Sequence, residues 1–366
     1  MRKYTQRSST RKRRILWWGR TGAYGEDYPR NRTVLAQLKQ LNIDITVFQP
    51  RISKLADIEA HLCRLPSVDL IWVPCFRQRD MAAAARYARR VGVPIIFDPL
   101  ISAFDKRVNE KRKYQADSWR GKRLLEWERG LFNAADRLVA DTQAHKAYFH
   151  QTHGVALDKI IVLPVSAEEQ LFFPRKTSYT PPKVPEALFF GSFIGLQGAE
   201  FIARAVELYQ GQPLKLTLLG DGPERPACER LVAQSTNPNI SVNFEDWIPF
   251  GELPDRIRRA DIALGIFGIG EKSSRVIPNK AYQSLACGLP LITMRSEAYP
   301  VDLGQEQGLF FVPPGDPQAI AEVLASCSAK LGQTLRDAAA HTYQRYFSSE
   351  QIGTALSATM AELDLK

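Results

Sequence analysis

The sequence lacks the features of several protein classes. No apolar run approaches the ~18 residues that a transmembrane helix needs, so we expect no membrane-spanning segment. The N-terminal stretch MRKYTQRSSTRKRRILWWG is basic but has no apolar core of the kind found in secretory signals. The five cysteines form no CxxC pair, and three of them lie in apolar runs, which fits buried thiols in a reducing compartment. We therefore expect a cytoplasmic protein, with peripheral association at the inner face of the membrane as a further expectation.

Three further absences limit the chemistry. The loop GRTGAYGEDYPRNR does not have the GxGxxG spacing of a dinucleotide-binding fingerprint, which disfavours an oxidoreductase. His145 and His150 would lie roughly 140° apart around a helix, and no DxD-like motif follows a strand, so we expect no metal site. No nucleic-acid-binding module is recognisable, and we expect no nucleic acid partner.

Positive charge is abundant but local. Residues 1–14 carry seven Lys or Arg and no acid, and residues 106–123 carry eight basic and two acidic side chains, so these segments contribute +7 and +6 to the net charge of +10 and the rest of the chain about −3. The first segment is typical of a disordered, solvated tail. The second has Tyr114 and Trp119 between its charges and Leu124 directly after them, which favours contact with an anionic membrane surface or a polyanionic acceptor. Both segments are predicted membrane contacts.

Short apolar strands alternate with helical segments along the chain, and this pattern predicts an α/β protein with parallel sheets. After the tail 1–14, we place a Rossmann-like acceptor domain at 15–173, a proline-rich linker at 174–186 and a Rossmann-like donor domain at 187–345. The segment 346–366 is predicted to be a helix that packs back on the first domain, with a capping box at Ser348 or Ser349. Two doubly wound sheets facing a cleft are the expected architecture.

Several motifs then point to a family. The stretches FFGSFIGLQGAEFIARAVEL, LTLLGDGPER, IPNKAYQSLACGLPLIT and GLFFVPPGDPQAIAEVL occur in this order between residues 189 and 324. In sequence and spacing they resemble the family 4 (group 1) glycosyltransferases of the GT-B fold. The resemblance implies a retaining, metal-independent, hexosyltransferase-type enzyme that transfers sugar from a nucleotide-diphosphate sugar to a lipid-linked or polysaccharide acceptor. It implies no cofactor other than this donor substrate.

The polar stretch before the helix of the third motif gives the resemblance a physical basis. A diphosphate that gains charge as the glycosidic bond breaks is stabilised by a helix N-terminus and nearby cations. A helix beginning near Asn279, with Pro278 in its first turn, would supply the backbone N–H groups. The residues predicted to bind the donor are Gly191, Ser192, Gln197, Lys272, Arg275, Asn279, Lys280 and Gln283, with Trp247 near the nucleobase.

The chain also departs from the family pattern. Gln283 and Arg275 occupy the positions of two family glutamates, and Ser192 and Gln197 occupy those of a family Arg and Lys. Lys272, Arg275 and Lys280 would then supply the missing positive charge. Glu271 is the predicted sugar contact in place of the first glutamate. Asp98 is the titratable residue where many members have a His, and Glu271 and Asp98 are the predicted catalytic residues.

The glycine loop near the N-terminus borders the acceptor and the donor phosphates in the family. Gly22, Tyr24, Arg30 and Arg32 are therefore the predicted contacts on the acceptor or phosphate side. Because the two glutamates are replaced, an alternative remains open: a catalytically inactive GT-B protein that binds a nucleotide sugar or acts as a scaffold. A sugar-nucleotide epimerase on the same fold is a further alternative.

Overall fold

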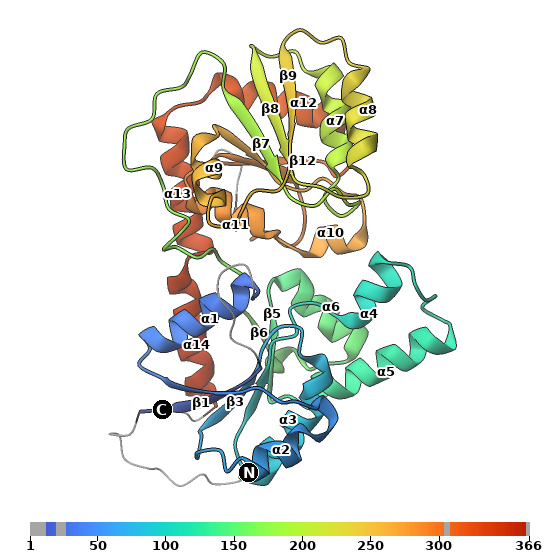
Figure 1. Ribbon diagram of the computed structural model, residues 1–366, viewed down its shortest axis with the longest axis vertical. Helices are drawn as coiled ribbons and strands as arrows, with labels where there is room; N and C mark the ends of the chain where they lie inside the picture. Colours follow the sequence, from blue (N-terminus) through green and yellow to red (C-terminus); the bar gives the residue numbers. More distant parts are fainter. Residues whose placement is uncertain (1–11, 20–26, 304–307, 364–366) are drawn as a thin grey trace.

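The chain folds into two lobes stacked one above the other (Figure 1). The computed structural model describes residues 12–19, 27–303 and 308–363. The lower, N-terminal lobe contains a six-stranded parallel sheet with the strand order β2-β1-β3-β4-β5-β6. Its strands are β1 Arg14–Trp18, β2 Asp44–Phe48, β3 Leu70–Val73, β4 Ile95–Phe97, β5 Arg137–Ala140 and β6 Ile160–Val162.

Helices cover both faces of this sheet, which explains why its central strands are apolar at every position. Strands β3 and β4, LIWV and IIF, are buried throughout. The helices are α1 Pro29–Gln40, α2 Ala56–Leu62, α3 Gln78–Val91, α4 Ala103–Asp105, α5 Trp119–Asn133 and α6 Gln143–His153. Three shorter turns are η1 Ser53–Leu55, η2 Lys106–Glu110 and η3 Leu157–Lys159.

The C-terminal lobe repeats the architecture. Its parallel sheet has the order β12-β11-β10-β7-β8-β9. The strands are β7 Glu186–Phe190, β8 Leu214–Leu219, β9 Ile240–Glu245, β10 Ile262–Leu264, β11 Leu291–Met294 and β12 Leu309–Val312. The helices are α7 Ala199–Leu208, α8 Arg225–Ala233, α9 Leu253–Arg259, α10 Glu271–Arg275, α11 Asn279–Ala286 and α12 Pro317–Ala329. The two doubly wound sheets confirm the predicted fold class.

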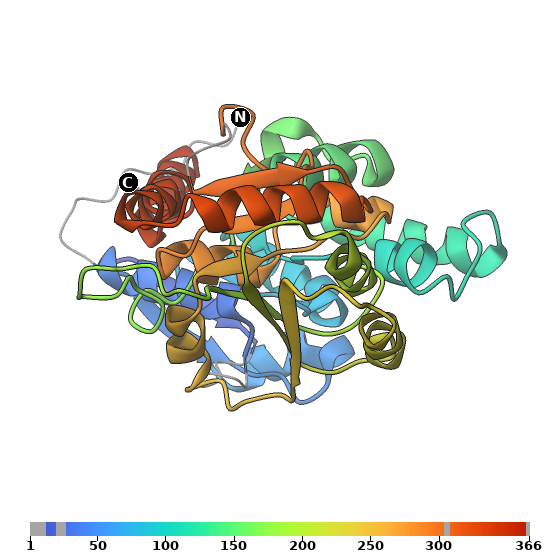
Figure 2. The same ribbon diagram turned by 90° about the horizontal axis from the view of Figure 1, so that it is seen from above.

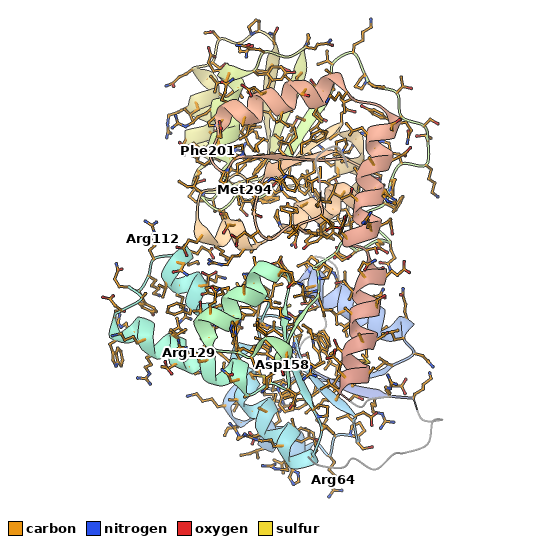
Figure 3. The ribbon with its side chains drawn as sticks, turned by 180° about the vertical axis from the view of Figure 1, so that it is seen from behind. Arg64, Arg112, Arg129, Asp158, Phe201 and Met294 are labelled. Atoms are coloured by element: carbon orange, nitrogen blue, oxygen red, sulfur yellow. The ribbon has the colours of Figure 1, made fainter. Side chains whose placement is uncertain are left out.

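Two final helices connect the lobes. Helix α13 (Gln333–Tyr346) packs against α11 in the C-terminal lobe, and α14 (Ser349–Glu362) packs against α1 and β6 in the N-terminal lobe. Figures 1 and 3 show them end to end along one side of the molecule. The predicted capping box is wrong: Ser348 is the N-cap residue but makes no capping bond with its side chain, and the Ser349 hydroxyl instead donates to Glu169 at 2.6 Å.

Two other sequence features have simple outcomes in the described residues. Four cysteines are buried as free thiols, and Cys63 is exposed. None of the helices described has the length and hydropathy needed to cross a bilayer.

Candidate active site

A cavity of about 740 Å³ lies between the two lobes. On the N-terminal side it is lined by residues that follow β3, β4, β5 and β6; on the C-terminal side, residues 190–192 at the end of β7 and Trp247 beyond β9 contribute. Carboxyl ends of parallel strands leave such crevices because the chain there turns away into helices. The cavity therefore occupies the place where both sheets direct their loops.

Helix α11 presents its first turn to this cavity. Pro278, Asn279, Lys280 and Gln283 all line it. Pro278 is the N-cap residue, one position earlier than predicted, and its extended backbone (φ −71°, ψ 152°) starts the helix at Asn279. The Tyr28 hydroxyl of the opposite lobe donates to Asn279 Oδ1 at 3.2 Å. The helix end thus faces the gap between the lobes.

Lys280 is the least compensated charge of the cavity. Lys280 is only 4% exposed, and its Nζ donates a hydrogen bond to Gln197 Oε1. The ammonium also lies 3.6 Å from the centre of the Phe189 ring. Burial lowers the pKa of Lys280 well below its usual value. No acidic side chain of the described residues forms an ion pair with it.

The other cations that line the cavity are paired. Arg32 Nε donates to Glu168 at 2.9 Å, and Lys272 forms an ion pair with Glu110 across the lobes. A buried ammonium without a counter-charge is costly, because it loses hydration that nothing replaces. An anion placed against Lys280 would therefore supply the counter-charge that the surrounding side chains do not provide.

Gly191 keeps the space in front of Lys280 open. Its φ of 151° is strained for residues with a side chain, and a Cβ there would lie 2.4 Å from Gln197 Oε1 and 2.9 Å from Lys280 Nζ. Ser192 follows directly and lines the same wall. The sequence FGS after β7 thus brings backbone and a small hydroxyl close to the ammonium.

The remaining predicted donor residues lie around this point. Gln283, one turn along α11, is buried at the cavity wall, and Trp247 lies at its edge with 53% of its surface exposed. The predicted set of Gly191, Ser192, Gln197, Lys272, Asn279, Lys280, Gln283 and Trp247 is therefore brought together on one cavity.

Arg275 and Glu271, two of the predicted site residues, do not line this cavity. Arg275 donates to Asp105 of the N-terminal lobe at 2.7 Å and lies over the Tyr148 ring at 4.4 Å. The guanidinium is therefore engaged in a contact between the lobes. The Glu271 side chain is 80% exposed and faces a separate hollow between residues 108–116 and 269–273.

Asp98 and Arg30, also predicted site residues, pair with each other away from the cavity. The two form a fully buried ion pair with 3.2 Å between Asp98 Oδ2 and Arg30 Nε. Arg30 further donates to the backbone carbonyl of Pro164 at 2.5 Å, so it ties α1 to the segment after β6. Burial raises the pKa of Asp98. Neither residue lines the cavity, whereas Arg32 does. Gly22 and Tyr24 lie outside the described residues.

Several residues that line the cavity were not predicted from the sequence. The unpredicted residues Tyr28, Phe76, Asp141, Phe190 and Phe250 line it. Phe76 and Asp141 do follow predicted strands, so their place after a strand end was an available signal. No sequence signal identified Tyr28 and Phe250, because they reach the cavity only where the two lobes meet.

Two histidines of α6 have structural partners. His145 bonds to Asp141 four residues earlier, and His153 Nε2 lies 3.1 Å from Glu128 Oε2. In the part of the chain that the structure describes, no group of three or more His, Cys, Asp or Glu side chains could hold a metal ion.

Known proteins share this architecture. A family model described as "Glycosyl transferases group 1" matches residues 184–329, and one described as "Glycosyl transferase 4-like domain" matches residues 17–166. The probable glycosyltransferase WbjE of Pseudomonas aeruginosa is 22% identical over 249 residues, which span 63% of this chain and 60% of that protein. The chain thus matches less than two thirds of the length of this relative.

Two solved structures show the same fold. Alr3699/HepE of Anabaena, in complex with UDP, superposes with a TM-score of 0.68 and 16% identity, covering 95% of this chain and 100% of that chain. Sucrose-phosphate synthase of Thermosynechococcus elongatus gives a TM-score of 0.70 and 16% identity, covering 97% and 100%. Since the two family models together span most of the chain and the fold agrees with them, the chain belongs to the group 1 (family 4) glycosyltransferases of the GT-B fold.

Proposed function

We propose that the protein is a retaining, metal-independent hexosyltransferase that uses a nucleotide-diphosphate sugar and a lipid-linked or polysaccharide acceptor. One observation carries the proposal: Lys280, a buried ammonium with no acidic partner among the described residues, forms part of the wall of the inter-lobe cavity. The complex of Alr3699/HepE with UDP supports a uridine nucleotide as the first donor to test.

The chemistry follows from where charge develops. As the bond between the sugar and the diphosphate breaks, negative charge grows on the leaving phosphate. Lys280 and the first N–H groups of α11 are fixed in place before the reaction, so they stabilise this charge without reorganisation. Ser192 and Gln283 add hydrogen-bonding groups on the same wall. A larger fraction of Lys280 is protonated with the diphosphate bound, because the anion raises the pKa of this lysine.

The predicted catalytic acids Glu271 and Asp98 are absent from the cavity wall. Asp27 and Asp141 are the carboxylates found there in the described residues, and Asp141 is bonded to His145. The proposed mechanism therefore relies on stabilisation of the leaving group by Lys280 and on positioning of the acceptor, with no protein general base assigned.

Peripheral membrane contact is part of the proposal. Residues 106–123 form η2, the loop after it and the start of α5, and Trp119 there is 68% exposed. Such basic and aromatic surfaces favour anionic bilayers. Most of the tail 1–14 lies outside the described residues.

A second function is favoured by one specific observation. Arg275, at the position of a family glutamate, is engaged with Asp105 and cannot replace a carboxylate. An inactive protein that binds a nucleotide sugar would tolerate this change.

A panel of nucleotide sugars separates the two functions. Thermal shift identifies the donors that bind, because a ligand specific to the folded state raises the melting temperature. Release of nucleoside diphosphate in the presence of lipid-linked acceptors then measures turnover. The transferase proposal expects both signals with the same donor; a stabilising donor without turnover on any acceptor would favour the inactive alternative.

A further inference from the structure

A second hollow of about 720 Å³ lies on the N-terminal lobe, outside the inter-lobe cavity. It is lined by residues at the start of α3, in α4 and η2, and in α5. Residues 103–133, which we call the arm, project from the body of the lobe in Figures 1 and 2. In Figure 3, Arg112 lies in the outer part of the arm and Arg129 lies on α5. No part of the donor chemistry described above uses this hollow.

The hollow is strongly cationic. It is lined by five arginines and one acid, Asp80, which forms an ion pair with Arg77. No ion pair with a described residue is formed by the other four arginines, which are Arg79, Arg107, Arg120 and Arg123. Guanidinium groups donate in pairs to phosphate oxygens, and this is why clustered arginines recognise phosphates. An anion with several oxygens is the ligand that this charge distribution fits.

Exposed indole rings stand beside the arginines. Trp119 is 68% exposed and Trp127 is 40% exposed, and both line the hollow. Arg123 lies over the Trp119 ring at 5.4 Å, which holds a cation beside an apolar surface. Indole rings are favoured where one side meets an apolar chain and the other meets water. The ligand should therefore carry an apolar group next to its anion.

One residue is shared by the hollow and the inter-lobe cavity. Phe76, after β3, lines both spaces. A molecule held by the arginines could extend past Phe76 to the cavity where Lys280 lies. The same molecule would then have its anionic group and apolar chain on the arm and its other end in the inter-lobe cavity.

We propose that the hollow binds the phosphate or diphosphate of an amphiphilic acceptor, with its apolar chain against Trp119 and Trp127. The proposal deepens the transferase function and rests on it in naming this ligand as the acceptor. Binding itself can be measured without any donor.

Dodecyl phosphate, used as monomers below its micelle concentration, is the probe. Its affinity for the full chain is measured by calorimetry for the wild type, for the double variant Arg120→Ala/Arg123→Ala, and for the control Arg51→Ala/Arg89→Ala. The control removes the same charge from exposed positions of the same lobe. We expect at least tenfold weaker binding in the first variant and unchanged binding in the control. Trp119→Ala should weaken the binding of dodecyl phosphate. The binding of inorganic phosphate, which is weaker in the wild type, should not change in this variant.

Each other result would overturn the inference. Equal losses in both double variants would indicate a nonspecific effect of charge. Recruitment to vesicles of phosphatidylcholine and phosphatidylglycerol without binding of monomers would indicate a membrane surface contact only. Tighter binding of a single-stranded oligonucleotide would indicate another class of ligand. Because UDP affinity is measured separately, failure of this site and failure of the donor site are distinguishable.

Discussion

Lys280 shows how a residue gains its role from its surroundings. The sequence placed it at the start of a helix after Pro278, and this position was predicted together with its part in the donor site. Its contact with Gln197 was not predicted, because the two residues are 83 positions apart. That contact also gives Gln197 a role, because its amide oxygen accepts a hydrogen bond from Lys280. In the family pattern, a lysine stands at the position of Gln197. Residue type and spacing predicted the cation, whereas its isolation from acids required the fold.

The pKa of Lys280 predicts that donor binding takes up protons. Burial lowers this pKa in the free protein, and a bound diphosphate would raise it, so the complex holds more protons than its parts. The affinity for UDP should therefore decrease as the pH rises above the pKa that Lys280 has in the free protein. Calorimetry at a series of pH values from about 8 upward, where phosphate groups are already ionised, in buffers with different ionisation enthalpies measures the uptake. Lys280→Met should abolish it; equal uptake in that variant would assign the proton elsewhere.

The same shift has a consequence for stability. Between the lowered pKa of the folded state and the usual pKa of the unfolded chain, the unfolded state binds more protons. The contribution of Lys280 to the free energy of unfolding therefore rises with pH in this window. Lys280→Met should raise the melting temperature, because it removes a buried charge that has no counter-ion.

At the level of elements, α10 connects the lobes. Two of its five residues, Lys272 and Arg275, form ion pairs with Glu110 and Asp105 of the N-terminal lobe. The sequence predicted both cations as ligands of the diphosphate, since a polar loop before a helix is a reasonable place for them. Their partners lie more than 160 positions away, and no local pattern could reveal them. Most strands and helices were predictable because their apolar periodicity is local; α13 was not identified.

A double-mutant cycle tests the contact of α10. Arg275→Gln and Asp105→Asn should each lower the melting temperature, because the Asp105 side chain is 1% exposed and loses its counter-charge or its hydrogen bond. The double variant should lose less unfolding free energy than the two single variants lose together, with a coupling energy of at least about 1 kcal/mol. Thermal unfolding followed by circular dichroism provides the values. Strictly additive losses would show that the pair is energetically irrelevant.

At the level of the whole molecule, α13 and α14 connect the two sheets. Tyr343 of α13 bonds to Ser166 and Glu169, which belong to the segment after β6, and α14 places Ile352, Leu356 and Met360 in the core of the N-terminal lobe. The return of the last helix to the first domain was anticipated from the sequence. The inter-lobe cavity was expected too, but the residues that complete it from both sides depend on how the lobes meet.

Leu356→Ala should destabilise the N-terminal lobe by about 2 to 5 kcal/mol, the usual cost of a cavity at a fully buried leucine. Scanning calorimetry should show the transition of that lobe at a lower temperature, with the transition of the C-terminal lobe unchanged. Val301→Ala, at a fully exposed position, serves as the control and should leave both transitions in place. A shift of the C-terminal transition alone would contradict the placement of α14.

The affinity of UDP for the wild type, Lys280→Met and the exposed control Lys183→Met tests the central claim most directly. Isothermal titration should give at least tenfold weaker binding for Lys280→Met, since the methionine keeps the volume and removes the only acid-free cation among the described residues of the cavity wall. Lys183→Met should bind as the wild type does. Unchanged affinity in a folded Lys280→Met variant would contradict the assignment of the diphosphate to this helix end.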